Sequence, residues 1–298
     1  MNSQKSIEDC VTSKFPHLFE SVREIITKSE RDFSRDKVLK RESFLWDHTL
    51  QVCAVAQKIC LEEGVDPLLP VITSLFHDIG KFDKGTYHSG DIPEEQLSSK
   101  KAESILIREG MDKKQTHQIT SSLETLYNEH KPLTRTAEIV HDSDFLAKSG
   151  HMGVAHFFIK SALRGTTLLN SLIQSSGREL TYASVLSQNM RTRTGKRIAA
   201  QKKKKTLSFF KGLIKEVNHL GNIHLKIRKL TWPCPNDPQK HIRVFMVLPH
   251  RCPECQGDIR TKNSSQKGIK CTQLITDIKC NKCSWKIQTR FCLPEVCP

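Results

Sequence analysis

The chain has 298 residues, of which 37% are hydrophobic and 27% are charged. This composition is typical of a soluble globular protein with one medium domain and one small one. No apolar stretch reaches the ~20 residues that a membrane helix needs. The N-terminus lacks the basic and apolar regions of a secretory signal. We therefore expect a cytoplasmic protein that makes no membrane contact.

The formal net charge of +15 is concentrated in one interval. Residues 191–229 carry thirteen basic side chains and a single acid, Glu216. Such an interval attracts polyanions, although a solvated helix face has the same composition. The candidate residues for contact with nucleic acid or phosphate are Arg191, Arg193, Lys196, Arg197, Lys202, Lys203, Lys204 and Lys205. Phe209 and Phe210 are the only aromatic residues there, which argues against a platform for stacking bases.

Two amphipathic helices are predicted in the first part of the chain, separated by a charged connector, and the second helix contains a histidine. Residues 7–29 predict an amphipathic helix, broken near Pro16, and residues 30–41 a charged connector. Farther on, Leu45, His48, Val52, Val55 and Ile59 recur every three or four residues and share one face of a helix. His48 on that apolar face is either a satisfied core histidine or a metal ligand.

A central, buried helix should follow. Asp66 and Pro67 fit its N-cap and first position, and the residues as far as Phe76 are apolar nearly all round. The helix brings His77 and Asp78 to its C-terminal end. Buried polar groups there are costly unless they are paired or bind a metal, and imidazole with carboxylate suits divalent transition ions.

Two histidines with open roles come next. Residues 82–96 predict a loop that carries His88, and a loop of this length in a compact domain is often functional. Helices are predicted over residues 98–109 and 114–128, and His130 follows the second one. His88 is either a surface histidine or an additional metal ligand. His130 lies either near the site or simply at a helix C-terminus, where the dipole favours it.

Residues 139–147 predict a further helix with acidic residues at its middle. Val140, Asp144 and Ala147 share a face, which turns Asp144 inward. The helical pattern resumes at His151 and continues to about residue 220, with a weak link at residues 175–177. Alternation between residues 225 and 248 then predicts strands.

The cysteines cluster at the C-terminal end, where eight of the eleven follow residue 230. Two C-x-x-C pairs lie 24 residues apart, and a returning hairpin would bring them together around one tetrahedral ion. The predicted structural zinc ligands are Cys252, Cys255, Cys280 and Cys283. Cys234, Cys271, Cys292 and Cys297 are left without an assigned role.

The order His48, His77-Asp78, Asp144 resembles the H…HD…D signature of the HD-domain metal-dependent phosphohydrolases. The segments WDHTLQVCAVAQKI, SLFHDIGKF, EIVHDSDFLAKSGHMGVAHF and MRTRTGKRIAAQKKKKTLSFFKGLIKEV carry the likeness, which spans about residues 40–220. The C-terminal pattern resembles a zinc ribbon. Phe145 departs from the family, because a basic residue often follows the last aspartate there.

The resemblance implies a division of roles. His48, His77, Asp78 and Asp144 would hold a divalent ion (Mn, Fe, Co, Mg or Zn), with Asp78 also orienting water. Lys81 would meet a phosphate oxygen, and Asp142 would hold the free N–H of a ligand histidine. The expected fold is mainly α: an N-terminal helix and connector over residues 1–40, an all-helical HD bundle over 41–222, and a small β-rich zinc ribbon over 223–298.

Three functions remain open at this point. The first is hydrolysis of a phosphoester or phosphoanhydride bond, in a nucleotide or another phosphorylated small molecule. The second is an HD nuclease to which the basic interval and the ribbon recruit RNA or DNA. The third is a non-catalytic domain that senses a nucleotide. The complete ligand set weighs against the third. Oligomeric state is left open.

Overall fold

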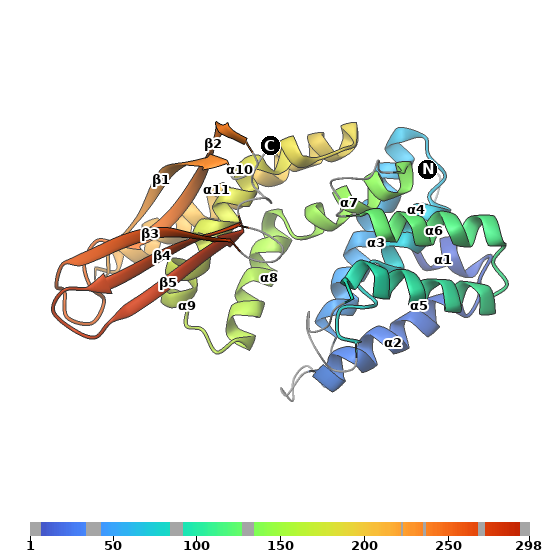
Figure 1. Ribbon diagram of the computed structural model, residues 1–298, viewed down its shortest axis with the longest axis horizontal. Coiled ribbons are helices and arrows are strands. Elements are labelled where there is room, and N and C mark those ends of the chain that lie inside the picture. The colour runs from blue at the N-terminus through green and yellow to red at the C-terminus, as the bar shows by residue number, and fades with distance from the viewer. Residues whose placement is uncertain are drawn as a thin grey trace. The chain divides into compact units, whose positions relative to one another are not determined.

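The computed structural model describes residues 7–33, 43–83, 92–126, 134–221, 223–234, 237–267 and 272–292. Helices precede strands along the chain, which confirms the expected mainly-α fold with a small β-rich C-terminal part (Figure 1). The first compact unit comprises Met1–Ala147 and Met190–Ile198, and the second comprises Lys148–Asn189 and Ala199–Pro298. Within the described ranges, no helix has both the length and the apolarity to cross a membrane.

The first unit is built from helices around one apolar core. Its helices are α1 (Ile7–Thr12), α2 (Leu18–Phe33), α3 (Phe44–Glu63), α4 (Leu68–Phe76), α5 (Glu94–Arg108), α6 (Lys113–Thr125) and α7 (Arg135–Ala147), and residues 190–198 add the first turn of α11 (Arg193–His219). The predicted break near Pro16 is confirmed by the gap between α1 and α2. Val22 and Ile26 of α2 are fully buried, so this helix covers the core as expected.

Helix α4 lies at the centre of this core. Val71, Ile72 and Phe76 are fully buried, as the uniformly apolar sequence predicts. The N-cap is Pro67, one residue later than the predicted Asp66, although a carboxylate oxygen of Asp66 accepts a hydrogen bond from the backbone N–H of Leu68 at 3.0 Å. A central, buried helix therefore ends at His77.

The predicted loop after this helix is shorter than expected. Helix α5 begins at Glu94, four residues before the predicted start at Ser98. Pro93, directly before it, fits a helix start, and two glutamates in the first turn interact favourably with the helix dipole. The consequence is that Glu94 belongs to a fixed helical turn.

The second unit combines helices with two small antiparallel sheets. Its helices are α8 (Gly150–Leu163), α9 (Leu168–Ser171), the π-helical turn η2 (Leu172–Ser176), α10 (Gly177–Asn189) and the remainder of α11. The predicted weak link at residues 175–177 is wrong, since η2 runs directly into α10 there. Gly177 allows this packing, because a Cβ atom would lie 2.5 Å from the carbonyl oxygen of Phe245.

Strands β1 (Leu225–Cys234) and β2 (Asp237–Pro249) form a hairpin, as the alternating sequence predicts. Strands β3 (Ile259–Lys267), β4 (Thr272–Cys280) and β5 (Lys286–Cys292) form a three-stranded sheet in the order β3-β4-β5. The first cysteine pair lies in the segment between β2 and β3, and the second lies at the end of β4 and in the turn that leads to β5. This arrangement agrees with a zinc ribbon.

The compact units divide the chain differently from the predicted boundary at residues 222–223. The core of the second unit joins Phe157 and Leu172 of its helices to Phe210 of α11 and to Met246 and Leu248 of β2. Apolar side chains on both the helices and the hairpin are buried by one another. The helices after Ala147 therefore pack with the strands, although their sequence resembles that of the HD segment.

Candidate metal centres

Helix α3 presents His48 from its first turns. Its start is fixed by Ser43, whose Oγ accepts from the N–H of Trp46 at 3.0 Å and donates to the Glu30 carboxylate at 2.6 Å. Glu30 also accepts from the N–H of Leu45. Since burial raises the pKa of Glu30, these donors stabilise a carboxylate that is only 4% exposed. They anchor the helix end nearest to His48.

The His77-Asp78 turn is clamped to helix α5 by a serine. Ser98 Oγ accepts from the N–H of Gly80 and donates to the carbonyl oxygen of His77, both at 3.1 Å. Gly80 makes this approach possible, because a Cβ atom there would lie 2.9 Å from the Glu94 carbonyl oxygen and from Leu97 Cβ. The turn and the helix are therefore held at a fixed separation.

The structure brings His48, His77, Asp78 and Asp144 together from three helical segments. His48 Nε2 lies 3.0 Å from Asp144 Oδ1 and 3.8 Å from Asp78 Oδ2. His77 Nε2 lies 3.4 Å from Asp78 Oδ2 and 3.8 Å from Asp144 Oδ1. All four residues are at most 5% exposed. Two ligands about 2.1 Å from one ion and at right angles to it are ~3.0 Å apart. The ligand atoms of His48, His77 and Asp78 all lie within 4.8 Å of one another, which suits a shared cation, and Asp144 adjoins both histidines.

The ring of His77 is oriented to serve as a ligand. Its Nδ1–H donates to the carbonyl oxygen of Ser74 at 2.7 Å, which leaves the lone pair on Nε2 pointing toward the two carboxylates. Among the described residues, this buried Nε2 has no hydrogen-bond partner. A buried polar nitrogen without a partner is costly, and a bound cation would satisfy it. The donor set therefore fits a divalent metal with nitrogen and oxygen ligands.

Lys81 and Glu94 line the same cluster. The Lys81 ammonium donates to Asp78 Oδ2 at 2.6 Å and lies 3.7 Å from Glu94 Oε1. Burial alone would lower the pKa of Lys81, but the charges of Asp78 and Glu94 raise it above its usual range. Burial, followed by the charge of Asp78, raises the pKa of Glu94 to about 8. Sequence patterning missed Glu94, which only the early start of α5 places here.

Asp142 lies elsewhere than expected. Its fully buried carboxylate accepts from the backbone N–H of Arg191 at 2.9 and 3.1 Å, from the N–H of Thr192 at 2.8 Å and from the Thr192 hydroxyl at 2.7 Å. His141 Nδ1 lies 3.1 Å away. Asp142 therefore holds the segment that precedes α11, and none of these partners is a predicted ligand histidine.

The remaining candidates are two histidines and the residues of the basic interval. His88 and His130 lie outside the described residues. In the basic interval, Arg197 pairs with Glu62, Lys202 donates to the Ser149 carbonyl oxygen and Lys203 to that of Ser184. These three cations have partners within the protein, although Arg197 is itself exposed. Arg191, Arg193, Lys196, Lys204 and Lys205 are also exposed.

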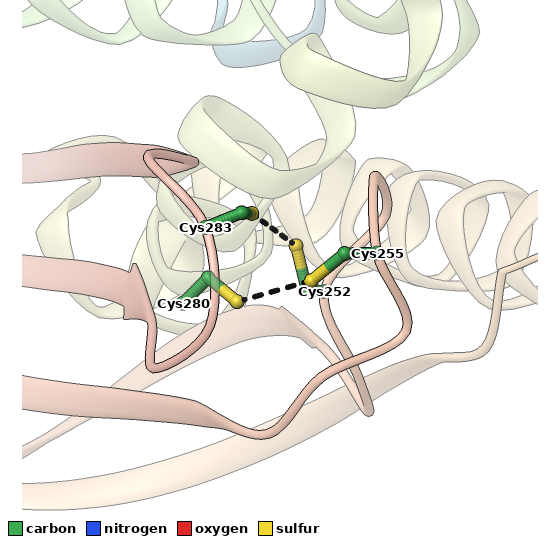
Figure 2. A group of neighbouring side chains, drawn as sticks. All are labelled: Cys252, Cys255, Cys280 and Cys283. Carbon is green, nitrogen blue, oxygen red and sulfur yellow. Dashed lines mark hydrogen bonds between the residues drawn. The ribbon is translucent and has the colours of Figure 1, made fainter.

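The four predicted zinc ligands meet at one end of the three-stranded sheet (Figure 2). Cys252 Sγ lies 3.5 Å from Cys283 Sγ, and Cys255 Sγ lies 3.4 Å from Cys280 Sγ. All four sulfur atoms lie within 4.8 Å of one another. Tetrahedral thiolates about 2.3 Å from zinc are ~3.8 Å apart, so the cluster fits one closed tetrahedral site.

The backbone around Cys280 supports its thiolate form, whereas desolvation and hydrogen bonds among the neighbouring thiols raise the pKa of Cys283. The N–H of Lys282 points at Cys280 Sγ at 3.2 Å, and backbone donors lower the pKa of the Cys280 thiol to about 6. Gln256 has φ of 56°, the left-handed conformation that turns the chain after the first pair. Cys271 and Cys297 lie outside the described residues, as do the side chains of Cys234 and Cys292.

Comparison with known proteins agrees with this geometry. Residues 45–148 match the family model of the HD domain. The crystal structure of Bacillus subtilis YpgQ is similar with a TM-score of 0.51 and 17% identity, over 70% of this chain and 95% of that one. The same protein in complex with ADP gives a TM-score of 0.48 at 19% identity, over 67% and 96% of the two chains.

A predicted HD superfamily hydrolase from an uncultured Thermotogales bacterium gives a TM-score of 0.48 at 17% identity, over 67% of this chain and 93% of that one. No curated protein sequence matched the chain. The likeness to YpgQ shows a shared fold, and the family model covers the helices that present the four clustered side chains. Residues 45–148 of this chain are therefore an HD domain, as the sequence motifs predict.

Proposed function

We propose that this HD domain hydrolyses a phosphoester or phosphoanhydride bond of a nucleotide, with His48, His77, Asp78 and Asp144 as the ligands of one divalent ion. The observation that carries the proposal is the buried His77 Nε2, which lacks a hydrogen-bond partner among the described residues and faces two carboxylates. A purely structural cluster would pair that nitrogen.

When bound, a divalent ion would supply an acidified water and polarise a phosphoryl oxygen. The chain's own groups would align the substrate. The Lys81 side chain is 18% exposed, so its ammonium lies at the border of the cluster, where a phosphate oxygen would replace part of its contact with Asp78. Asp78 would orient the attacking water through the carboxylate that now accepts from Lys81.

Glu94 supplies a second group for proton transfer. Because burial and Asp78 raise its pKa to about 8, it is mainly protonated at neutral pH in this structure. A protonated carboxyl beside the cluster can donate to a leaving-group oxygen. Lys81 lies beside it, with Nζ 3.7 Å from Glu94 Oε1.

The nucleotide is proposed from the family resemblance and from the position of Lys81. Phe145 follows Asp144 where a cation is common in the family, and its ring lies 4.8 Å from that of His141. No phosphate contact is available from Phe145, which leaves Lys81 as the proposed phosphate-binding cation. Nitrogen and oxygen ligands suit Mn²⁺, Fe²⁺ or Co²⁺, and the metal is to be found by reconstitution.

The test is release of phosphate and pyrophosphate from a panel of nucleoside mono-, di- and triphosphates, with each divalent ion added separately. His77→Ala should abolish turnover, whereas His17→Ala, at an exposed histidine of the same unit, should leave it unchanged. Full turnover by the His77→Ala variant would refute the assignment. A labelled RNA in the same assay separates nucleotide hydrolysis from nuclease action.

A further inference from the structure

The three-stranded sheet has one buried face and one exposed face. Leu274, Ile278 and Ile287 are at most 8% exposed and lie in the cores of the second unit. Because side chains alternate along a strand, the residues between them point to the other side. Figure 1 shows β3, β4 and β5 lying side by side. The inner face supplies the apolar packing of the sheet, so the exposed face is not needed for that packing.

Three cations lie directly opposite one another on this exposed face. Lys279 of β4 is paired with Arg260 of β3 on one side and with Lys286 of β5 on the other. All three side chains are exposed. Directly opposed residues are about 5 Å apart, and like charges in such pairs destabilise a sheet. No contact among the described residues of the sheet requires this row, which favours a ligand that would use it.

Two more cations extend the row into a patch. Lys262 is paired with Asp277, and Arg290 with Ile275, on the same face. Asp277 is the one acid on this face within the described strands, and its carboxylate accepts from Gln288 Nε2 at 2.8 Å. We name Arg260, Lys262, Lys279, Lys286 and Arg290 the ribbon cationic face. None of these five forms an ion pair among the described residues.

We propose that the ribbon cationic face binds the phosphate backbone of nucleic acid. Five cations on a sheet about 10 Å wide complement a ligand with closely spaced negative charges, and nucleic acid carries the highest such density. The exposed Ser264, Gln266 and Gln288 add polar groups of the kind that contact phosphate and sugar.

The same face is poorly suited to other partners. The one apolar side chain described on it, Ile275, is only 7% exposed, whereas a protein interface needs buried apolar or aromatic anchors. A membrane-binding face likewise needs apolar groups to insert. No described aromatic side chain points to this side to stack on bases. Binding should therefore be independent of sequence and strongly dependent on salt. It does not depend on the proposed phosphohydrolase activity.

The test uses the full-length, zinc-loaded protein and a fluorescein-labelled 20-base-pair DNA, with anisotropy measured between 25 and 200 mM NaCl. Arg260→Gln, Lys279→Gln and Lys286→Gln together should weaken binding at least about tenfold at 100 mM salt. They should also reduce the slope of log K against log salt by about two to three. Thermal stability should not fall, because the like-charge row is removed.

The matched control replaces Lys100, Lys113 and Lys114 by Gln, three exposed lysines on helices of the first unit, with the same loss of charge. It should change affinity less than about threefold. Equal weakening by both triple variants, absence of binding by the wild type, or equally good competition by polyglutamate at matched charge would each overturn the proposal. Turnover of a mononucleotide should be the same in both triple variants, which separates this surface from the HD centre.

Discussion

Replacing Asp142 by alanine provides a sharp test of how the first unit is held together. The carboxylate is fully buried and accepts hydrogen bonds from two backbone N–H groups, those of Arg191 and Thr192, and from the Thr192 hydroxyl. Gly195 packs so closely that a Cβ atom there would lie 2.2 Å from Asp142 Oδ2. The contact thus ties α7 to the start of α11, 49 or 50 residues later in the chain.

The magnitude follows from the donors that would be left without an acceptor. Each buried, unsatisfied N–H costs about 1–3 kcal/mol, so Asp142→Ala should lower the free energy of unfolding by about 3–5 kcal/mol. For a unit of this size, that corresponds to a fall of roughly 10 °C in the melting temperature. Asp112→Ala is the control, because Asp112 caps α6 through a single exposed bond to the N–H of Gln115 at 2.9 Å. It should cost only about 1 kcal/mol.

The assay is urea unfolding followed by circular dichroism at 222 nm, with hydrogen exchange of residues 190–198 to locate the loss of protection. Metal content at the HD centre should not change in the folded variant. Two results would contradict this reasoning: Asp142→Ala destabilises the protein no more than Asp112→Ala does, or it empties the HD centre without loss of stability. Asp142 would then act on the metal ligands, as the sequence suggested.

Three further predictions concern the two metal centres. Gly80→Ala should lower stability by about 1–3 kcal/mol and reduce turnover, because the added Cβ would lie 2.9 Å from atoms of α5. The control Gly212→Ala, where nothing lies within 4 Å of an added Cβ, should be neutral or stabilising. Thermal melts of the two variants make the comparison. Lys81→Met should reduce kcat on the order of a hundredfold while the metal content of the HD centre stays unchanged. Loss of the metal would instead show that Lys81 has a structural role. Cys280→Ser should abolish zinc binding and protection of residues 259–292 from hydrogen exchange without reducing metal at the HD centre, and protection that survives would refute the closed site.

The clustered ligands could be predicted from the sequence because each lies on a strongly patterned helix. The stripe around His48 and the apolar run before His77 fix which way these side chains point. Asp144 follows from the same argument on α7. The cysteine pairs were predictable for a different reason: their spacing leaves few arrangements other than one tetrahedral site.

Other features depend on tertiary contacts that local patterns do not encode. Glu94 appeared to be in a loop, and it approaches Lys81 only because Gly80 and Ser98 let α5 come close to the His77 turn. Asp142 has the pattern of a residue near the ligands, but its partners lie about 50 residues away in the chain. The helices after Ala147 carry family-like segments yet pack with the strands, because Phe210 and Leu248 share one core.

The central claim is that His48, His77, Asp78 and Asp144 hold one divalent ion. A crystal of the full-length protein grown with MnCl₂ and measured at the manganese absorption edge tests it directly. The account predicts one anomalous peak about 2.0–2.3 Å from His77 Nε2 and bonded to the other three side chains. A manganese peak elsewhere, or an ordered centre with His77 Nε2 paired to a protein group and no peak beside it, would contradict the claim.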